Sequence, residues 1–255
     1  MYLKGILKKT RDQKVFRAPE RVHVDPERFK GFPVPILSGP VTVDLFITDN
    51  CNLRCAHCFS NQGETKGELS LIDVKVILDQ LEAMGVFEVR INGGEPFTHP
   101  EIAGILEELS QRRLRRVIIT NGTLLDEDTV RLLKYSKTIP TVSLDDSTPD
   151  GHDEFRGVKG AFERTIKGMK NLKDLGIEFG VNTCLHRGNM KHVKDIVDLA
   201  ASYGASKIAF LDLKILGRMT ENQNLAPSPS EYRKAAKRLR LLKSLSTEVE
   251  VSLDA

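Results

Sequence analysis

The chain has 255 residues, 40% of them hydrophobic, and its 38 basic and 35 acidic residues nearly cancel to a net charge of +3. A chain of this length and apolar content can bury a sizeable core, as one large domain or as a domain with an appendage. The balanced charge gives no reason to expect nucleic acid or a membrane surface as a partner, and no apolar run is long enough to span a bilayer.

Residues 1–40 are expected to form a basic arm rather than a domain. They hold nine Lys or Arg against four Asp or Glu, and prolines and glycines are frequent after residue 30. Two interpretations stay open: a contact for a substrate or partner, and a solvated lead-in that packs on the next segment. The basic start does not match a secretion signal, so we expect a cytoplasmic location, where thiols remain reduced.

From Val41 onward, strand-like and helix-like segments alternate. The expected strands are 41–49, 87–91, 117–120, 141–144, 177–185, 207–216 and 249–253. The first five expected helices begin near Ser70, Pro100, Asp126, Ala161 and Met190, and a sixth, basic helix carries an apolar stripe of Tyr232, Ala235, Leu239 and Leu242. Six strand–helix units predict parallel strands with right-handed crossovers, and too few residues remain to close an eight-unit barrel. The expected fold class is α/β, a partial (β/α)6 barrel of parallel strands.

Three cysteines, Cys51, Cys55 and Cys58, follow the first expected strand with the spacing C-x3-C-x2-C. This spacing lets three thiolates bind three irons of a [4Fe-4S] cluster, and the fourth iron then lacks a cysteine and can bind a small molecule. The alternatives are a zinc site that adds His57 and a cluster that only carries electrons; zinc ligands usually come as two separated pairs. Cys184 is expected to be a buried small side chain in the fifth strand.

Gly93, Gly94, Glu95 and Pro96 follow the second expected strand. Two glycines permit close approach of the backbone to a ligand and the proline fixes the exit, although the same residues could simply form a turn. Asn121 follows the third expected strand, where it could equally be a turn residue before Gly122.

Taken together, the motifs resemble the radical S-adenosylmethionine (radical SAM) superfamily. They are CNLRCAHC (51–58), NGGEP (92–96), ITNG (119–122), VSLDD (142–146), HDEFRG (152–157) and LKILGRM (213–219). Within the superfamily they are most similar to enzymes that modify peptides or mature cofactors and carry a SPASM or Twitch auxiliary-cluster extension. The resemblance covers about residues 41–219, which it implies to be the partial barrel core. Residues 220–255 are expected to be a last helix and strand-like run, or the start of a C-terminal extension.

The resemblance also implies roles for individual residues. Cys51, Cys55 and Cys58 would bind the open-iron cluster, and the segment from Gly93 to Pro96 would bind the amino group of S-adenosylmethionine. The remaining cofactor contacts would come from residues that meet the ribose and carboxylate, namely Asn121, Ser143, Asp145 and Arg156, and from residues that flank the adenine, namely Phe59 and 215–217.

Two further points concern the rim of this site. Asp146 stands where many members of the resembled family have glycine, so an added charge is expected near the site and the local turn is expected to differ from theirs. Asn182, His186 and Asn189 surround the end of the fifth expected strand and could reach a substrate, although a lone histidine in a loop is more often solvated or hydrogen-bonded.

The function implied by the resemblance is that of an enzyme. With one electron, S-adenosylmethionine would be cleaved to methionine and a 5′-deoxyadenosyl radical, which abstracts hydrogen from a peptide or cofactor-precursor substrate. The expected partners are that substrate and an electron donor such as a flavodoxin or ferredoxin, and neither nucleic acid nor a membrane. The alternative is a non-catalytic iron-sulfur electron carrier, which would not need the motifs after the second to fourth strands.

Overall fold

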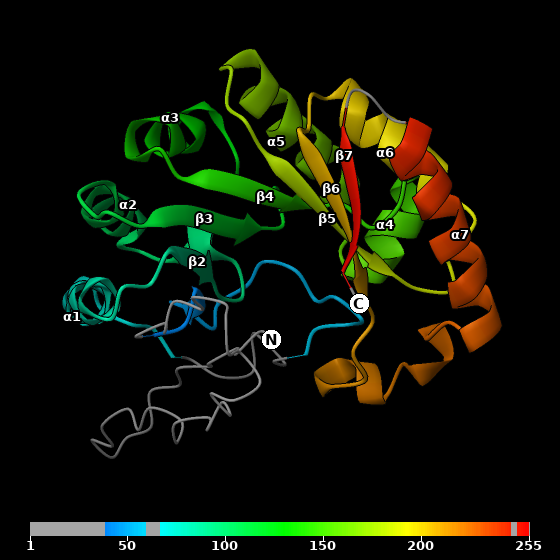
Figure 1. Cartoon of the computed structure of the whole chain (residues 1–255), viewed down its shortest axis with the longest axis horizontal. Helices are drawn as coiled ribbons and strands as arrows, with labels where there is room; N and C mark the ends of the chain where they lie inside the picture. Colours follow the sequence, from blue (N-terminus) through cyan, green and yellow to red (C-terminus); the bar gives the residue numbers. More distant parts are fainter. Residues whose placement is uncertain (1–38, 60–66, 246–248, 255) are drawn as a thin grey trace, which may run out of the picture.

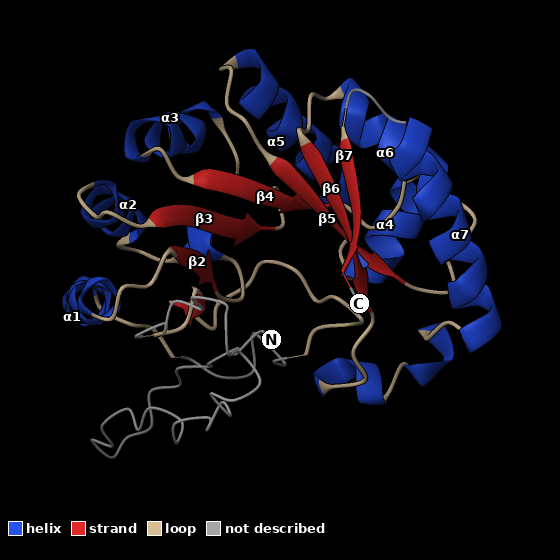
Figure 2. Ribbon diagram, viewed as in Figure 1, coloured by secondary structure: helices blue, strands red, loops and turns tan. Residues whose placement is uncertain are grey.

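A computed structural model describes residues 39–59, 67–245 and 249–254, so nearly all of the expected basic arm lies outside the described residues. Within these residues, seven strands form one sheet: β1 (Thr42–Phe46), β2 (Glu88–Asn92), β3 (Arg115–Thr120), β4 (Ile139–Ser143), β5 (Gly180–Leu185), β6 (Lys207–Asp212) and β7 (Glu250–Asp254). Each strand pairs in parallel with the next one along the chain, in the order β1 to β7. The sheet curves inside an arc of helices (Figures 1 and 2). The predicted α/β partial barrel is confirmed, and the seventh strand-like run joins it as a parallel strand.

In the described part of the chain, seven α-helices accompany the strands: α1 (Leu71–Ala83), α2 (Ile102–Ser110), α3 (Glu127–Ser136), α4 (Pro149–Arg156), α5 (Ala161–Asp174), α6 (Val193–Ser202) and α7 (Pro229–Leu245). The predicted start at Ser70 is confirmed by a reciprocal capping box with Asp73. Asp126 likewise caps α3 by accepting a hydrogen bond from the backbone N–H of Thr129. No helix among these described residues has the length and apolar character needed to cross a bilayer.

Two helix starts differ from the prediction, and one helix was missed. α2 begins two residues after Pro100, and α6 begins three residues after Met190. The second shift arises because Asn189 forms a turn, accepting at its carbonyl from the His192 N–H at 2.8 Å. α4 was not predicted because its eight residues are mostly polar and too few to show a helical apolar period.

The apolar core lies between the sheet and the outer helices. Val74, Leu78 and Leu81, the predicted inner stripe of α1, are buried against it. Tyr232, Ala235, Leu239 and Leu242 of α7 also pack toward this core. The described part of 220–255 therefore contributes α7 and β7 to the same sheet, and the division near residue 219 stays a prediction.

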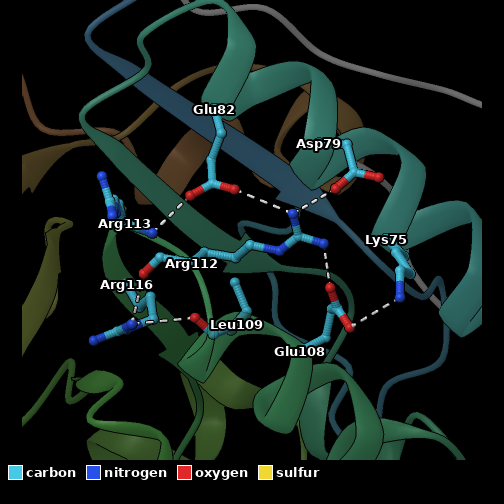
Figure 3. A network of polar contacts seen from close by, with 8 residues as sticks. All are labelled: Lys75, Asp79, Glu82, Glu108, Leu109, Arg112, Arg113 and Arg116. Carbon is cyan, nitrogen blue, oxygen red and sulfur yellow. Dashed lines mark hydrogen bonds and ion pairs between the residues drawn. The ribbon is translucent and has the colours of Figure 1, made fainter.

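A polar network ties α1 to α2 at the edge of the sheet where the strands begin (Figure 3). The Arg112 guanidinium, with an 11% exposed side chain, contacts the carboxylates of Asp79, Glu82 and Glu108. The backbone N–H of Arg113 donates to Glu82 at 2.7 Å. In barrels of this kind the edge where strands begin serves stability, and the opposite edge carries the active site.

Candidate functional site

The three cysteines lie on the loop that leaves the carboxyl end of β1. Cys55 is 9% exposed, and Cys51 and Cys58 are partly buried. All three pack in one small apolar cluster with Leu53 and Ala161. Burial raises the pKa of the Cys51 thiol to about 11, and the nearby Cys55 and Glu95 add to this effect. Thiols placed in this way need a positively charged partner before they ionise, as an iron-sulfur cluster provides.

The helix that sequence reasoning missed supports this loop. The N–H of Arg54 donates to the Arg156 carbonyl at 3.1 Å, and the N–H of Ala56 donates to the Phe155 carbonyl at 2.9 Å. These are carbonyls of the last turn of α4, which a helix leaves without partners of its own. The end of α4 thus fixes the loop on both sides of Cys55.

A second support comes from the glycine segment after β2. The N–H of Gly94 donates to the Thr48 carbonyl at 2.8 Å, and that of Glu95 donates to the Asn50 carbonyl at 2.7 Å. A Cβ on Gly94 would lie 2.2 Å from the Asn50 oxygen and 2.8 Å from Cys51 Cβ, which no side chain tolerates. Glycine is required here because the segment runs directly against the first cysteine.

The Glu95 carboxylate is fully buried and points to the end of β3. It accepts hydrogen bonds from the Thr120 hydroxyl and the Asn121 N–H, both at 2.7 Å, and from the Phe97 N–H at 3.3 Å. Phe97 belongs to a short 3-10 helix, η2 (Pro96–Thr98), whose first residue Pro96 is also buried. Burial raises the pKa of Glu95 to about 7, although the three hydrogen bonds oppose the shift. The carboxylate therefore joins the ends of β2 and β3.

Asn121 also contacts the cysteine loop. Its side chain is 7% exposed and donates to Asn52 Oδ1 at 2.8 Å, while its own Oδ1 accepts from the Thr123 N–H and hydroxyl. The side chain of Asn52 completes the connection by donating to Thr123 Oγ1. Asn121 therefore stabilises the turn that follows β3, as the turn interpretation predicted. Its side chain also holds the loop between Cys51 and Cys55 in place.

Asp145 and Arg156 form a buried ion pair beside Cys55. Arg156 Nη2 lies 2.5 Å from Asp145 Oδ2, and Asp145 Oδ1 accepts from the Cys184 N–H at 2.8 Å. Arg156 Nη1 lies 3.7 Å from Cys55 Sγ. Burial acts to raise the pKa of Asp145, but the Arg156 charge, the nearby His57 and His152 and the hydrogen bond from Cys184 together lower it below its usual value. Ser143 ends β4 on the same edge of the sheet, in register with Asn182 of β5.

Asp146, the departure from the family pattern, is built into the local turn. Its Oδ1 accepts from the N–H and hydroxyl of Thr148, both at 2.9 Å. Its Oδ2 lies 3.2 Å from His192 Nδ1. Because Thr148 in turn caps α4, the added carboxylate helps to start the helix that holds the cysteine loop.

A third support for the loop comes from the segment after β6, which the sequence linked only to adenine. It contains two 3-10 helices, η3 (Gly217–Thr220) and η4 (Gln223–Leu225). Arg218 Nε donates to the Cys55 carbonyl at 3.0 Å, and its backbone N–H donates to the Cys58 carbonyl at 3.0 Å. Gly217, at φ 56°, leaves no room for a Cβ, which would lie 2.4 Å from the Cys58 oxygen. This segment and Phe59, a 48% exposed ring in edge contact with Phe46, therefore lie side by side.

Three rings form a stack that connects the loop to the end of β5. His57 lies parallel to Phe155 at a centroid distance of 4.4 Å, and Phe155 lies parallel to His186 at 3.9 Å. Burial, with the Arg156 charge next, lowers the pKa of His57 to about 4. The geometry places His57 in this stack, in contrast to the zinc alternative that would have used it as a ligand. Within residues 39–59, 67–245 and 249–254, no three His, Cys, Asp or Glu side chains are arranged to hold one metal ion.

The polar residues after β5 are mainly engaged with the protein. Asn189 is buried and donates to the carbonyls of Asp145 and Cys184 at 2.7 and 2.8 Å. The Nδ1 of His186 accepts from the Gly188 N–H at 3.2 Å. Cys184, expected to be buried, is only partly buried.

The carboxyl edge of the sheet thus gathers the predicted site residues around one loop. The donor set fits an iron-sulfur cluster, because three thiols share an apolar cluster and glycines keep the neighbouring backbone close. The contacts of Arg156 and Arg218 with Cys55, and the ring stack, were not foreseen. Only the basic and aromatic residues of the HDEFRG and LGRM runs gave a signal for them.

The chain is similar to known proteins over most of its length. The model of the radical SAM superfamily matches residues 45–200. The chain is 31% identical over 201 residues to an AdoMet-dependent heme synthase of Methanosarcina barkeri, covering 78% of this chain and 58% of that protein. It is 33% identical over 206 residues to the antilisterial bacteriocin subtilosin biosynthesis protein AlbA of Bacillus subtilis, covering 80% and 45%. The chain spans about half the length of the curated relatives it matches.

Among solved structures, the fold is similar to that of Streptococcus suis SuiB bound to its precursor peptide SuiA. The TM-score is 0.76 at 22% identity, over 86% of this chain and 49% of SuiB.

Proposed function

Because the chain belongs to the radical SAM superfamily, we propose that it is the catalytic barrel of a maturase that acts on a peptide or a cofactor precursor. Support comes from its relatives, which include a bacteriocin biosynthesis protein and a heme synthase. A protein of similar fold carries a precursor peptide. The family implies a [4Fe-4S] cluster and S-adenosylmethionine as cofactors.

Together the bound cofactors supply one-electron cleavage of S-adenosylmethionine to methionine and a 5′-deoxyadenosyl radical, which takes a hydrogen atom from the substrate. The chain's own residues bind and position them. Cys51, Cys55 and Cys58 would hold three irons. Arg54, Ala56 and their hydrogen bonds to α4 would keep the loop in place while the cluster changes charge.

The S-adenosylmethionine contacts are assigned to the ends of β2 to β4. Since the Glu95 carboxylate is occupied by Thr120, Phe97 and Asn121, the amino group would meet the backbone of Gly93 and Gly94. Ser143 and Arg156 supply a hydroxyl and a guanidinium suited to the carboxylate and ribose, and Asp145 keeps the guanidinium in place. Phe59 and the segment 215–217 would enclose the adenine.

One observation carries this proposal: the glycine segment and the first cysteine touch. Gly94 can lie against Asn50 and Cys51 only because it has no side chain. A protein that only carries electrons requires the cysteine loop, but it does not require a glycine segment packed against that loop. A cofactor that binds the open iron and the β2 end together needs both.

The experiment is anaerobic reconstitution of the chain with iron and sulfide, followed by addition of S-adenosylmethionine and dithionite. We expect 5′-deoxyadenosine and methionine in equal amounts, and a changed electron paramagnetic resonance spectrum of the reduced cluster. A full cluster with an unchanged spectrum and no 5′-deoxyadenosine would favour the electron-carrier alternative. We further propose a low-potential flavodoxin or ferredoxin as the physiological source of the electron.

A further inference from the structure

The outer surface of α7 is strongly basic. Its exposed cations are Arg233, Lys234, Lys237, Arg238, Arg240 and Lys243, and Glu231 is the one acidic residue of the helix. The opposite face, with Ala235 and Leu239, is buried in the core. Leu241 is 59% exposed one turn from the cations. Leu241 therefore adds an exposed apolar side chain to the basic surface.

A groove of about 340 Å³ lies between this helix and the turn that precedes α6. Met190 and Ala235 line it together with Lys191, Lys234 and Arg238. Its acidic member, Glu231, is already engaged, since it accepts from the Ser228 N–H at 2.7 Å and lies 3.6 Å from Arg187 Nε. The groove therefore presents net positive charge to a partner.

This surface is connected to the cysteine loop through packed residues. Arg187, which pairs with Glu231, directly follows His186 in the chain. The rings of His186 and Phe155 stack with centroids 3.9 Å apart, and those of Phe155 and His57 stack with centroids 4.4 Å apart. His57 lies between Cys55 and Cys58 in the sequence. Electron tunnelling is faster through bonded and stacked atoms than across gaps, so the stack is a favourable route from the basic surface to the cluster ligands.

We propose that Lys191, Lys234, Lys237 and Arg238 form the docking surface for an acidic protein that carries one electron at low potential. This assignment rests on the proposed function, and it identifies the surface through which the electron for S-adenosylmethionine cleavage enters the protein. One electron leaves the reduced flavin or iron-sulfur centre of the carrier, which is oxidised by one, and the cluster is reduced by one. Such complexes are small and transient and are assembled by charge steering, which the exposed lysines suit.

The positive charge and the ring path favour this occupant over an acidic peptide substrate. A peptide substrate must reach the reacting atoms inside the barrel, and the stack of His186, Phe155 and His57, which ends at the cysteine loop, does not help it to bind there. The carrier needs only an approach to the outside of the barrel, where Figure 1 shows α7 on the outer arc of helices.

The test compares two reductants on the reconstituted protein. The triple variant Lys234→Glu/Lys237→Glu/Arg238→Glu should bind oxidised flavodoxin about tenfold more weakly than the parent by calorimetry at low salt. It should also form 5′-deoxyadenosine about tenfold more slowly with a photoreduced flavodoxin. With dithionite, a small ion that needs no docking, its rate should equal the parent's. A matched control, Arg164→Glu/Lys167→Glu/Lys170→Glu, makes the same charge change on the exposed face of α5 and should leave both rates unchanged.

The outcomes are separable. An unchanged flavodoxin rate in the triple variant would overturn the docking surface, and a raised KM for substrate instead would assign the surface to the substrate. Parent protein that makes no 5′-deoxyadenosine even with dithionite would overturn the proposed function. If the triple variant does not fold, Lys191→Glu, a single change on a loop, should still slow the flavodoxin reaction with a weaker effect at high salt.

Discussion

Nη1 of Arg156 lies 3.7 Å from Sγ of Cys55, and Nη2 of the same guanidinium pairs with the carboxylate of Asp145. The resemblance had assigned Arg156 to S-adenosylmethionine, and the structure adds a contact to Cys55, a proposed cluster ligand. A cation beside a ligand sulfur stabilises the reduced cluster, whose charge is more negative. The contact therefore bears on the reduction potential as well as on binding.

Arg156→Met should make the reduction potential more negative, because the neutral side chain no longer stabilises the added electron. A shift of about 60 mV would change the ratio of reduced to oxidised cluster tenfold at a fixed poise. Redox titration followed by electron paramagnetic resonance measures it. Arg156→Lys, which keeps the charge, should recover part of the shift, and equal potentials in all three proteins would contradict the assignment.

Cys55→Ala should abolish the cluster, since Cys55 is one of three thiols in one apolar cluster. Reconstituted parent protein should hold about four irons per chain, as a [4Fe-4S] cluster requires. Cys184→Ala is the matched control, because this thiol lies on β5 and not on the loop. Loss of iron in the Cys184 variant would show that the ligand set is wrong.

Gly94→Ala should prevent formation of a stable cluster or strongly reduce its yield. The new Cβ would lie 2.2 Å from the Asn50 oxygen, so either the cysteine loop or the segment after β2 must move. Iron content and the visible absorption spectrum after reconstitution measure this. Gly180→Ala is the control, because its Cβ would meet its nearest neighbour at 3.6 Å, an ordinary contact. Full clusters in both variants would refute the argument from close approach.

Glu95→Gln should weaken S-adenosylmethionine binding more than Ser143→Ala does, with full iron in both. Both Glu95 oxygens accept hydrogen bonds, so an amide nitrogen would face a donor at the β3 end at a cost of about 1 to 3 kcal/mol. Loss of the Ser143 hydroxyl should cost about 0.5 to 1.5 kcal/mol. Equilibrium binding and the rate of 5′-deoxyadenosine formation check this. Parent-like cleavage in both variants would remove these residues from the cofactor site.

Arg112→Met should lower the free energy of unfolding by about 1.5 to 3 kcal/mol, because the carboxylates of Glu82 and Glu108 lose a charged hydrogen-bond partner. The methionine keeps the aliphatic stem, so packing changes little. Denaturant unfolding of the iron-free chain measures the difference. Arg113→Met is the control, since its exposed side chain leaves the backbone bond to Glu82 intact and should cost little.

The sequence by itself determined the order of strands and helices, because caps and apolar periods act over a few residues along the chain. The Ser70 and Asp126 starts and the α1 stripe are of this kind. The spacing of the three cysteines also lies in the sequence, since a short loop is enough to bring their thiols together. The family could be inferred because several such local motifs occur in one order.

Only the tertiary structure decided which groups meet across the carboxyl edge of the sheet. Glu95 turns to β3, Arg156 turns to Asp145 and Cys55, and His57 and His186 enclose Phe155. Glu95 and Asn121 are 26 positions apart and Arg156 and Cys55 are 101 positions apart, and no local period records such contacts. α4 was missed for the same reason: a helix under about 12 residues is marginal alone, and its contacts with the cysteine loop stabilise it.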